Sequence, residues 1–186
     1  LGFNTLRKHI KVEAEEFYYQ CDRLGMVVFQ DMVNNGDYAY VRDTVLPTFF
    51  RQHKCDRNMH PDPAARKAFL DGMEATVKQL KNHPCICYWT IFNEGWGQFE
   101  STRVYRRLKE LASSRFIAPF SGWFKGGESD VTAEHIYFKP FRPTRTDKPL
   151  VLSEFGGYSC PTEGHVFSPD KLFGYRMYKS IDELKA

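Results

Sequence analysis

Short apolar runs alternate along the chain with segments in which apolar residues recur every three or four positions. The first pattern predicts strands and the second predicts amphipathic helices. The expected strands cover 3–10, 26–31, 85–92, 116–120, 134–138 and 150–153. The expected helices cover 12–24, 63–81, 100–113 and 169–184, with a further helix around 40–53, interrupted near Pro47, inside a long insertion over 32–59.

Two of the expected helices begin with the same local signal. Asp62 and Ser168 are residue types that cap helix N-termini, and each is followed by a proline, which suits the first helical position. After Asp62, apolar residues form one helical stripe that continues to Lys81. The signal therefore predicts that one helix starts at 63 and another at 169.

Strands that alternate with helices predict βαβ units and a parallel sheet. Such strands are covered on both faces and read as unbroken apolar runs, as 26–29 and 86–92 do. Nucleotide-binding folds share this alternation, but they need a GxGxxG or GxxxxGK[ST] motif. Neither motif occurs in the chain, so the nucleotide-binding interpretation is disfavoured.

Composition limits the class of protein further. The chain has 186 residues, of which 42% are hydrophobic and 26% charged, enough for one globular domain with a sizeable core. The net charge of +3 is spread along the chain, so no nucleic-acid or membrane-surface partner is expected. No apolar run approaches the ~20 residues of a membrane span. The five cysteines are an odd number without scaffold spacing, and we expect free thiols rather than disulfides.

Two glutamates stand close behind expected strands: Glu94 after Asn93, and Glu154 after Ser153. In a (β/α)8 barrel the carboxyl ends of the strands meet around one mouth, where catalytic residues lie. Two carboxyl groups in one mouth, one protonated and one ionised, are the minimum equipment for glycoside hydrolysis. An isolated glutamate at a strand end is more often solvated or salt-bridged. The neighbouring glycines and aromatic residues favour the catalytic interpretation, because they allow close approach and desolvate a carboxyl group.

Five motifs in order give the sequence a specific resemblance. They are FNTLRKH, DRLGMVVFQD, a segment from HP to NEGWG, HIY and LSEFGG, at 3–9, 22–31, 83–97, 135–137 and 152–157. Together they resemble the catalytic barrel of glycoside hydrolase family 2, which includes β-galactosidases, β-glucuronidases and β-mannosidases. The resemblance spans nearly the whole chain. It implies a (β/α)8 TIM barrel and a retaining β-glycosidase that hydrolyses terminal β-linked sugars by double displacement.

The resemblance also implies roles for the matching positions. Glu94 is similar to the general acid/base of the family, and Glu154 is similar to its nucleophile. Asn93 resembles the residue that binds the sugar 2-hydroxyl, Tyr137 the tyrosine that orients the nucleophile, and Arg7 the arginine beneath it. The charge of Arg7 would keep Glu154 ionised. The two carboxyl groups are then expected to lie roughly 5–5.5 Å apart.

Further substrate contacts are expected from His9 and Asp31 at strand ends, and from Trp96 and Trp123 as walls on which a sugar ring stacks. Ordinary packing is an equally good interpretation of each tryptophan. The chain contains no HExxH motif and no Cys/His cluster with metal-ligand spacing. The sequence therefore requires no metal and no other cofactor.

The length departs from that of a full barrel, which typically needs about 250 residues. We expect an incomplete barrel of about six βα units, equivalent to strands two to seven, because each unit takes roughly 31 residues. Strands one and eight, the strand-eight tryptophan and the β-sandwich domains of the family would then be missing. Open barrel edges are exposed and prone to self-association.

The chain starts at Leu1 inside an expected strand, without an initiator Met or a signal peptide. We therefore expect 1–186 to be one catalytic barrel domain from a longer chain, with weak activity or none when isolated. The compartment is left undefined. A second interpretation stays open: a non-catalytic carbohydrate-binding or interaction fragment on the same barrel frame. Retention of both glutamates argues against it, because binding alone needs no paired acid and nucleophile.

Overall fold

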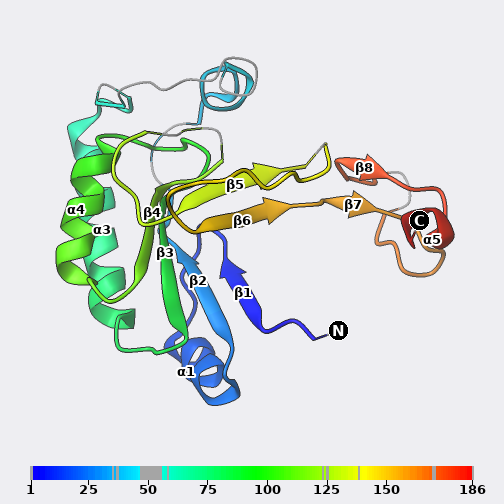
Figure 1. Ribbon diagram of the computed structural model, residues 1–186, viewed down its shortest axis with the longest axis horizontal. Coiled ribbons are helices and arrows are strands. Elements are labelled where there is room, and N and C mark those ends of the chain that lie inside the picture. Colours follow the sequence, from blue (N-terminus) through cyan, green and yellow to red (C-terminus); the bar gives the residue numbers. More distant parts are fainter. Residues whose placement is uncertain are drawn as a thin grey trace.

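The computed structural model describes residues 2–34, 36, 38–46, 56–57, 59–122, 124, 126–137, 139–168 and 171–185. Figure 1 shows a curved sheet with helices packed along one side, and an arm that extends away from the sheet at the C-terminal end of the chain. This is the α/β arrangement that the alternating pattern predicts.

Four parallel strands lie side by side in chain order: β1 (Thr5–Lys8), β2 (Val27–Asp31), β3 (Ile86–Phe92) and β4 (Phe116–Phe120). A second parallel pair is formed by β5 (Thr132–Ile136) and β6 (Leu150–Phe155). A backbone hydrogen bond of 3.1 Å from Asp130 N to Ile117 O connects the two sheets. Among the described residues β1 pairs only with β2 and β6 only with β5, so the barrel is incomplete, as expected.

Helices α1 (Glu15–Leu24), α3 (Pro63–Leu80) and α4 (Ser101–Leu111) pack on the outer side of the sheet (Figure 1). The start of α3 confirms the capping signal, because the Asp62 carboxylate accepts a hydrogen bond of 2.9 Å from Ala64 N. Gly25 ends α1 with a φ of 67°, a conformation that glycine adopts without a steric penalty. The outer core is formed by apolar residues of these helices and of β3, including Phe69, Met73, Val77, Leu108, Ile86, Trp89 and Ile91.

A smaller core lies on the inner face of the sheet. It contains Tyr88, Ala118, Val131 and Ala133, which are buried together. Strand β3 contributes to both cores, which explains why its sequence is an unbroken apolar run. The two cores pack on the sheet and support the carboxyl ends of the strands, from which side chains can project.

The helix predicted over 169–184 is wrong for 171–180, and only its last turn is helical. Strand β7 (Tyr158–Ser159) pairs in parallel with β8 (Arg176–Met177), and only α5 (Ile181–Lys185) is helical. Backbone hydrogen bonds of 2.8 Å run from Tyr175 N to Gly157 O and from Tyr178 N to Ser159 O. Aromatic residues and a glycine over 173–175 are poor helix formers, so pairing with β7 replaces the helix that the capping signal predicts.

The bounds of the other elements differ less from the predicted ones. The strand predicted over 134–138 is shifted to Thr132–Ile136, so Tyr137 follows the strand instead of lying in it. The first strand ends at Lys8 because Ile10 has a positive φ of 47°. In the insertion, a short π-helix, η1 (Val41–Val45), occupies part of the predicted helix, whereas 47–55 lie outside the described residues. Four cysteines are free thiols, and Cys55 is not described: Cys21, Cys85, Cys87 and Cys160.

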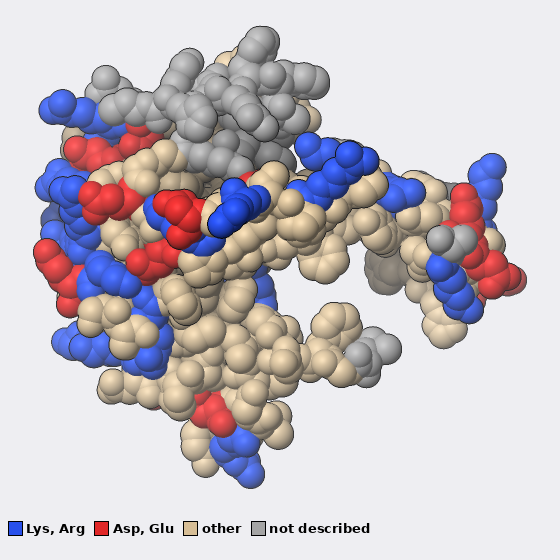
Figure 2. Space-filling model, in the orientation of Figure 1, with Lys and Arg blue, Asp and Glu red and all other residues tan. Residues whose placement is uncertain are grey.

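The surface has two different sides. Charged residues gather over α3 and α4, whereas the hollow between the arm and the lower body is lined largely by uncharged residues (Figure 2). Large apolar side chains are exposed both before β1, as in Phe3, and along the arm, as in Phe155, Phe167 and Phe173. Among the described residues, no helix combines the length and the apolar character needed to cross a bilayer.

Candidate active site

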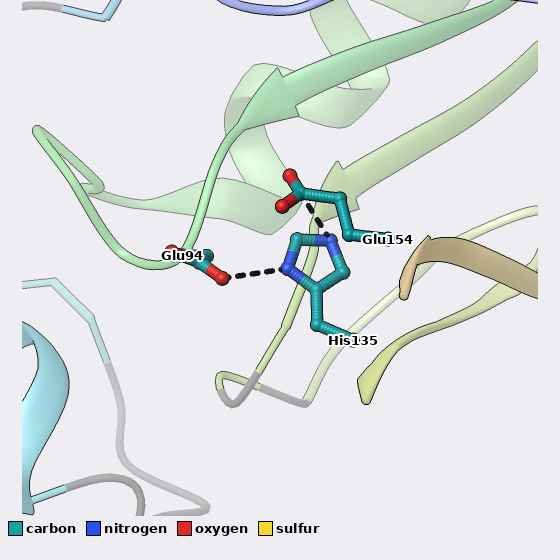
Figure 3. A group of neighbouring side chains, drawn as sticks. All are labelled: Glu94, His135 and Glu154. Carbon is teal, nitrogen blue, oxygen red and sulfur yellow. Dashed lines mark hydrogen bonds and ion pairs between the residues drawn. The ribbon is translucent and has the colours of Figure 1, made fainter. Parts of the chain in front are cut away.

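The carboxyl ends of the strands bring distant parts of the chain together at one edge. Glu94 follows β3, His135 lies near the end of β5 and Glu154 near the end of β6. Figure 3 shows the imidazole of His135 between the two carboxyl groups. One carboxylate oxygen of Glu94 and one of Glu154 lie within 4.8 Å of each other. The two glutamates therefore face one shared site, although 60 positions separate them.

A tight turn presents Glu94 to this site. Trp96 N donates a hydrogen bond of 2.9 Å to Asn93 O, and the two residues between them have positive φ values of 51° for Glu94 and 80° for Gly95. A non-glycine residue in this region costs on the order of 1–3 kcal/mol, and such strain is concentrated at functional sites. A Cβ atom at Gly95 would lie 2.1 Å from the ring of Phe124, so glycine is required there. The NEGWG sequence thus encodes the turn that aims the carboxyl group.

Glu154 is held by cationic and hydroxyl groups. The guanidinium of Arg7 forms an ion pair with its Oε1, and the hydroxyl of Tyr137 donates to its Oε2. Burial alone would raise the pKa of Glu154, but the charges of His135 and Arg7 and the hydrogen bond from Tyr137 outweigh it. The pKa of Glu154 is therefore below its ordinary value, and the group is ionised at neutral pH.

Arg7 is itself fixed by a second carboxylate. Its Nε and Nη2 donate to the two oxygens of Asp31, at 3.1 and 2.8 Å. Burial alone would lower the pKa of Arg7, but Asp31 and Glu154 raise it, so the guanidinium stays charged. Burial alone would raise the pKa of Asp31, but His9 and Arg7 lower it. This bidentate pair fixes the direction in which Arg7 meets Glu154.

Asn93 is oriented by two donors. Its Oδ1 accepts hydrogen bonds from Arg7 Nη2 at 3.0 Å and from Ser121 Oγ at 3.1 Å. These contacts direct the amide nitrogen away from Arg7. Asn93 is thereby held in one orientation beside Glu94.

Tyr137 contacts both carboxyl groups. Besides its hydrogen bond to Glu154, its hydroxyl lies 2.9 Å from Glu94 Oε1 and 3.4 Å from His135 Nδ1. Burial, the hydrogen bond to Glu154 and the charge of Glu94 raise the pKa of Tyr137 far above its usual range. The hydroxyl therefore keeps its proton and acts as a donor.

The remaining residues predicted to contact substrate differ in their relation to the site. His9 lies at the rim, with Nδ1 3.4 Å from Asp31 Oδ2 and 3.8 Å from Glu154 Oε1, and a hydrogen bond to Asp31 raises its pKa. Trp96 donates through Nε1 to Gly36 O at 3.2 Å, and its ring lies 5.4 Å from that of Tyr38. Trp123 lies outside the described residues.

Two residues of the site were missed by sequence reasoning. His135 Nδ1 lies 2.7 Å from Glu94 Oε1, and the side chain of His135 is completely buried. The signal for it is the spacing of two positions from Tyr137, because residues two apart in extended chain point to the same side. Tyr175 comes from the arm, and its ring lies 4.5 Å from that of Tyr137. Nothing in the sequence could predict this contact, because 175 falls in a segment that reads as a helix.

The arm also explains a glycine of the LSEFGG motif. A Cβ atom at Gly157 would lie 2.4 Å from the ring of Tyr175. Burial and the charges of Glu94 and Glu154 raise the pKa of Tyr175. Tyr175 is thus part of the wall of the site.

Glu94, His135 and Glu154 are also the described residues that could hold a metal ion, since one ligand atom from each lies within 4.8 Å of the others. The cationic guanidinium of Arg7, however, already occupies the oxygen of Glu154 that faces this group. The donor set is therefore better suited to proton chemistry than to a cation.

A large surface cavity lies elsewhere. It has a volume of about 720 Å³ and is lined by residues around the start of α4, including Gln98, Ser101, Thr102 and Arg106. None of the paired carboxyl groups lines it. Size alone does not identify a catalytic site, and the convergent ionisable groups mark the other location.

Comparison with known proteins agrees with the fold and the motifs. A β-galactosidase of Klebsiella pneumoniae is 28% identical over 149 residues, which cover 80% of this chain and 13% of that protein. A human β-glucuronidase is 30% identical over 119 residues, which cover 64% of this chain and 15% of that protein. The chain thus spans about one seventh of the length of these curated relatives.

Solved structures show the same fold. The structure of a β-D-glucuronidase from Dictyoglomus thermophilum matches with a TM-score of 0.62 and 18% identity, covering 93% of this chain and 33% of that one. A β-galacturonidase from Eisenbergiella tayi matches with a TM-score of 0.56 and 18% identity, covering 88% of this chain and 31% of that one. The sequence model of the glycosyl hydrolases family 2 TIM barrel domain matches residues 1–181. The chain therefore belongs to the TIM barrel domain family of the family 2 glycosyl hydrolases.

Proposed function

We propose that the protein hydrolyses terminal β-glycosides with retention of anomeric configuration, within one catalytic domain over 1–186. The observation that carries the proposal is the spacing of the carboxylate oxygens of Glu94 and Glu154, within 4.8 Å. Retaining enzymes place their carboxyl groups roughly 5–5.5 Å apart, whereas inverting enzymes need roughly 6.5–9.5 Å to admit a water molecule. The short separation supports a covalent intermediate.

In the first step, an oxygen of Glu154 attacks the anomeric carbon while the bond from that carbon to the leaving oxygen breaks. Glu94 gives its carboxyl proton to the leaving oxygen, which departs as an alcohol. The ionised state of Glu154 suits it to attack, and the Arg7 ion pair supports that state. The product of the step is a glycosyl ester of Glu154.

In the second step, Glu94 is a carboxylate and accepts a proton from water. The water oxygen bonds to the anomeric carbon, and the ester bond to Glu154 breaks. Two displacements at one carbon restore its configuration. Glu94 recovers its proton and Glu154 its charge, so the site returns to its initial state.

The other predicted residues have supporting roles in the proposal. Asn93 binds the sugar 2-hydroxyl, and Tyr137 and Arg7 orient and charge-stabilise the nucleophile. Asp31 fixes Arg7, and His9 contacts substrate at the rim. Stacking of a sugar on Trp96 and Trp123 stays a prediction.

We also propose how the exposed apolar faces are covered. Additional domains, such as the β-sandwich domains that the family resemblance implies, would cover the open edge at β1 and the arm. In their absence a second copy of the chain would do so. The exposed fractions of 80% for Phe3 and 67% for Phe155 support this, because exposed apolar patches of this kind mark contact surfaces.

A panel of aryl β-glycosides, including galactosides, glucuronides and mannosides, tests the proposed activity. It is assayed on the 186-residue chain and on the longest natural polypeptide that contains it. We expect Glu154→Gln to lower kcat/KM by at least about a thousandfold, as loss of a nucleophile does. Glu74→Gln is the matched control, because Glu74 is also a glutamate paired with an arginine, but at the outer surface. Full activity of Glu154→Gln would rule out this assignment.

A further inference from the structure

We propose that His135 is a positioning residue that acts through Glu94: its Nδ1–H holds the carboxyl group and stabilises the carboxylate left when Glu94 gives up its proton. The inference rests on the proposed glycosidase function and assigns a part of that site that the motifs leave open. Its basis is the 2.7 Å contact between His135 Nδ1 and Glu94 Oε1, in which the side chain of His135 is completely buried and that of Glu94 is largely buried (Figure 3).

The space around this contact is shaped for it. Gly122 follows β4, and a Cβ atom there would lie 3.0 Å from Glu94 Cγ and 3.3 Å from His135 Nδ1. Any larger residue would press on both members of the pair. The φ of 75° at Gly122 also favours glycine. The fold therefore provides a close-fitting pocket in which the carboxyl group and the imidazole have a single arrangement.

The donors available set the direction of these hydrogen bonds. Tyr137 has one hydroxyl proton, which is shared between Glu154 Oε2 and Glu94 Oε1, the latter at 2.9 Å. Once Glu94 has given up its proton, both of its oxygens can only accept hydrogen bonds. The 2.7 Å contact with His135 then requires Nδ1–H as the donor. His135 thus supplies Glu94 with a donor that Tyr137, which also serves Glu154, provides only in part.

This arrangement favours the acid step. As the O–H bond of Glu94 breaks and its proton moves to the leaving oxygen, negative charge develops on the carboxyl group. The hydrogen bond from His135 strengthens with that charge, so it stabilises the transition state more than the ground state. In the second step the same N–H keeps the carboxylate aimed while it accepts a proton from water.

The charged and titratable groups that face His135 come from four elements. Glu94 follows β3, Tyr137 follows β5 and Glu154 lies on β6, with Oε1 3.7 Å from His135 Nε2. Arg7 and His9 lie beyond Glu154 and neutralise part of its charge. The second nitrogen of His135 thus faces an anion, which keeps the imidazole oriented with Nδ1 towards Glu94.

The test compares two amide substitutions. The amide of His135→Asn reaches the position of Nδ1, whereas the amide of His135→Gln reaches that of Nε2 and leaves Glu94 without its donor. For each variant kcat/KM is measured with two substrates of the same sugar. One substrate has an alkyl leaving group, whose oxygen must be protonated as it departs. The other has a 2,4-dinitrophenyl group, which departs as the phenolate without being protonated.

We expect His135→Gln to lower kcat/KM for the alkyl glycoside by about tenfold to a hundredfold, part of the roughly 10²- to 10⁴-fold effect of general acid catalysis. The dinitrophenyl glycoside should change by less than about threefold, because its departure needs no acid. His135→Asn should restore most of the loss. In the pH profile of kcat/KM for the alkyl glycoside, the alkaline limb of His135→Gln should move to higher pH. The reason is that loss of the donor disfavours the ionised form of the Glu94 carboxyl group.

The matched control is His83→Gln. The side chain of His83 is also largely buried and contacts a carboxylate, that of Asp22, through Nδ1 at 2.6 Å, but it lies outside the site. The His83→Gln variant should leave the ratio of the kcat/KM values for the two substrates unchanged. An equal loss for both substrates in His135→Gln, or equal behaviour of the Asn and Gln variants, would overturn this inference alone. Absence of turnover by the wild-type protein would overturn the proposed function as well.

Discussion

Arg7 connects the ends of four strands through one guanidinium group. It lies on β1 and contacts Asp31 of β2, Asn93 after β3 and Glu154 of β6. Nε and Nη2 contact Asp31, Nη2 also contacts Asn93, and Nη1 contacts Glu154, a fork of donors that a lysine could not reproduce. The charge that keeps Glu154 ionised and the geometry that orients its carboxylate therefore depend on the same side chain.

Removal of this charge should change the pH dependence of the activity. The pKa of Glu154 is lowered in the folded protein, in part by Arg7, and Glu154 must be ionised to attack. In Arg7→Met the pKa of Glu154 should rise, so activity is lost at a higher pH as the solution is acidified. The acid limb of kcat/KM should move to higher pH, and the maximum should fall. Arg7→Lys keeps a charge and should shift the limb less. An acid limb of Arg7→Met that coincides with the wild-type limb would contradict this role.

Some residues of the site could be predicted from the sequence and others could not. Glu94, Asn93 and Glu154 lie in glycine-flanked motifs at strand ends, where short-range signals place them. Partners across the sheet are harder, because a contact such as His135 with Glu94 depends on how β3 and β5 are aligned. Tyr175 depends on the path of the arm, which no local pattern records.

Helices begin where the sequence predicts when the capping residue and the residues that follow it both favour a helix. Helix α3 begins where Asp62 and Pro63 predict it, because the cap and the first helical residue act within one turn. The same signal at Ser168 did not produce a long helix. There, pairing of β8 with β7 supplies backbone hydrogen bonds that compete with the helix. A capping signal thus predicts a start only where the following residues also favour a helix.

The cap of α3 gives a stability prediction. Asp62→Ala removes the acceptor for Ala64 N, so it should lower the free energy of unfolding by about 0.5–2 kcal/mol. Thermal unfolding followed by circular dichroism measures the change, and activity should be unaffected because α3 lies outside the site. Asp71→Ala is the matched control. Asp71 lies on the same helix and pairs at the surface with Lys67, a contact worth about 0.3–0.5 kcal/mol. Equal losses of unfolding free energy in both variants would show that the cap stabilises the protein no more than a surface ion pair does.

The molecule as a whole is an open crescent of parallel strands with a site at one edge. Its outer face is closed by helices, but β1 and the arm leave apolar side chains exposed on both sides of the hollow seen in Figure 2. A closed sheet would bury such edges. The sequence predicts this openness through the count of strands, although it does not predict the direction in which the arm extends.

Exposure of this kind should make the 186-residue chain self-associate. Sedimentation velocity over a range of concentrations should show dimers or larger species, and Phe3→Lys combined with Phe155→Lys should shift the distribution towards monomer. Leu111→Lys is the control, because Leu111 is 39% exposed at the end of α4, on the outer, helical side of the sheet. A wild-type chain that stays monomeric throughout would contradict the proposed edge contacts.

Covalent trapping of the intermediate tests the central proposal most directly. A 2-deoxy-2-fluoro β-glycoside with a dinitrophenyl leaving group is incubated with the protein, and the labelled peptide is identified by mass spectrometry. The fluorine slows both displacements and the activated leaving group restores the first, so the glycosyl ester accumulates. We predict one sugar attached to Glu154 and none on Glu154→Gln. A label on any other residue, or hydrolysis of the parent glycoside without any adduct at Glu154, would contradict the account.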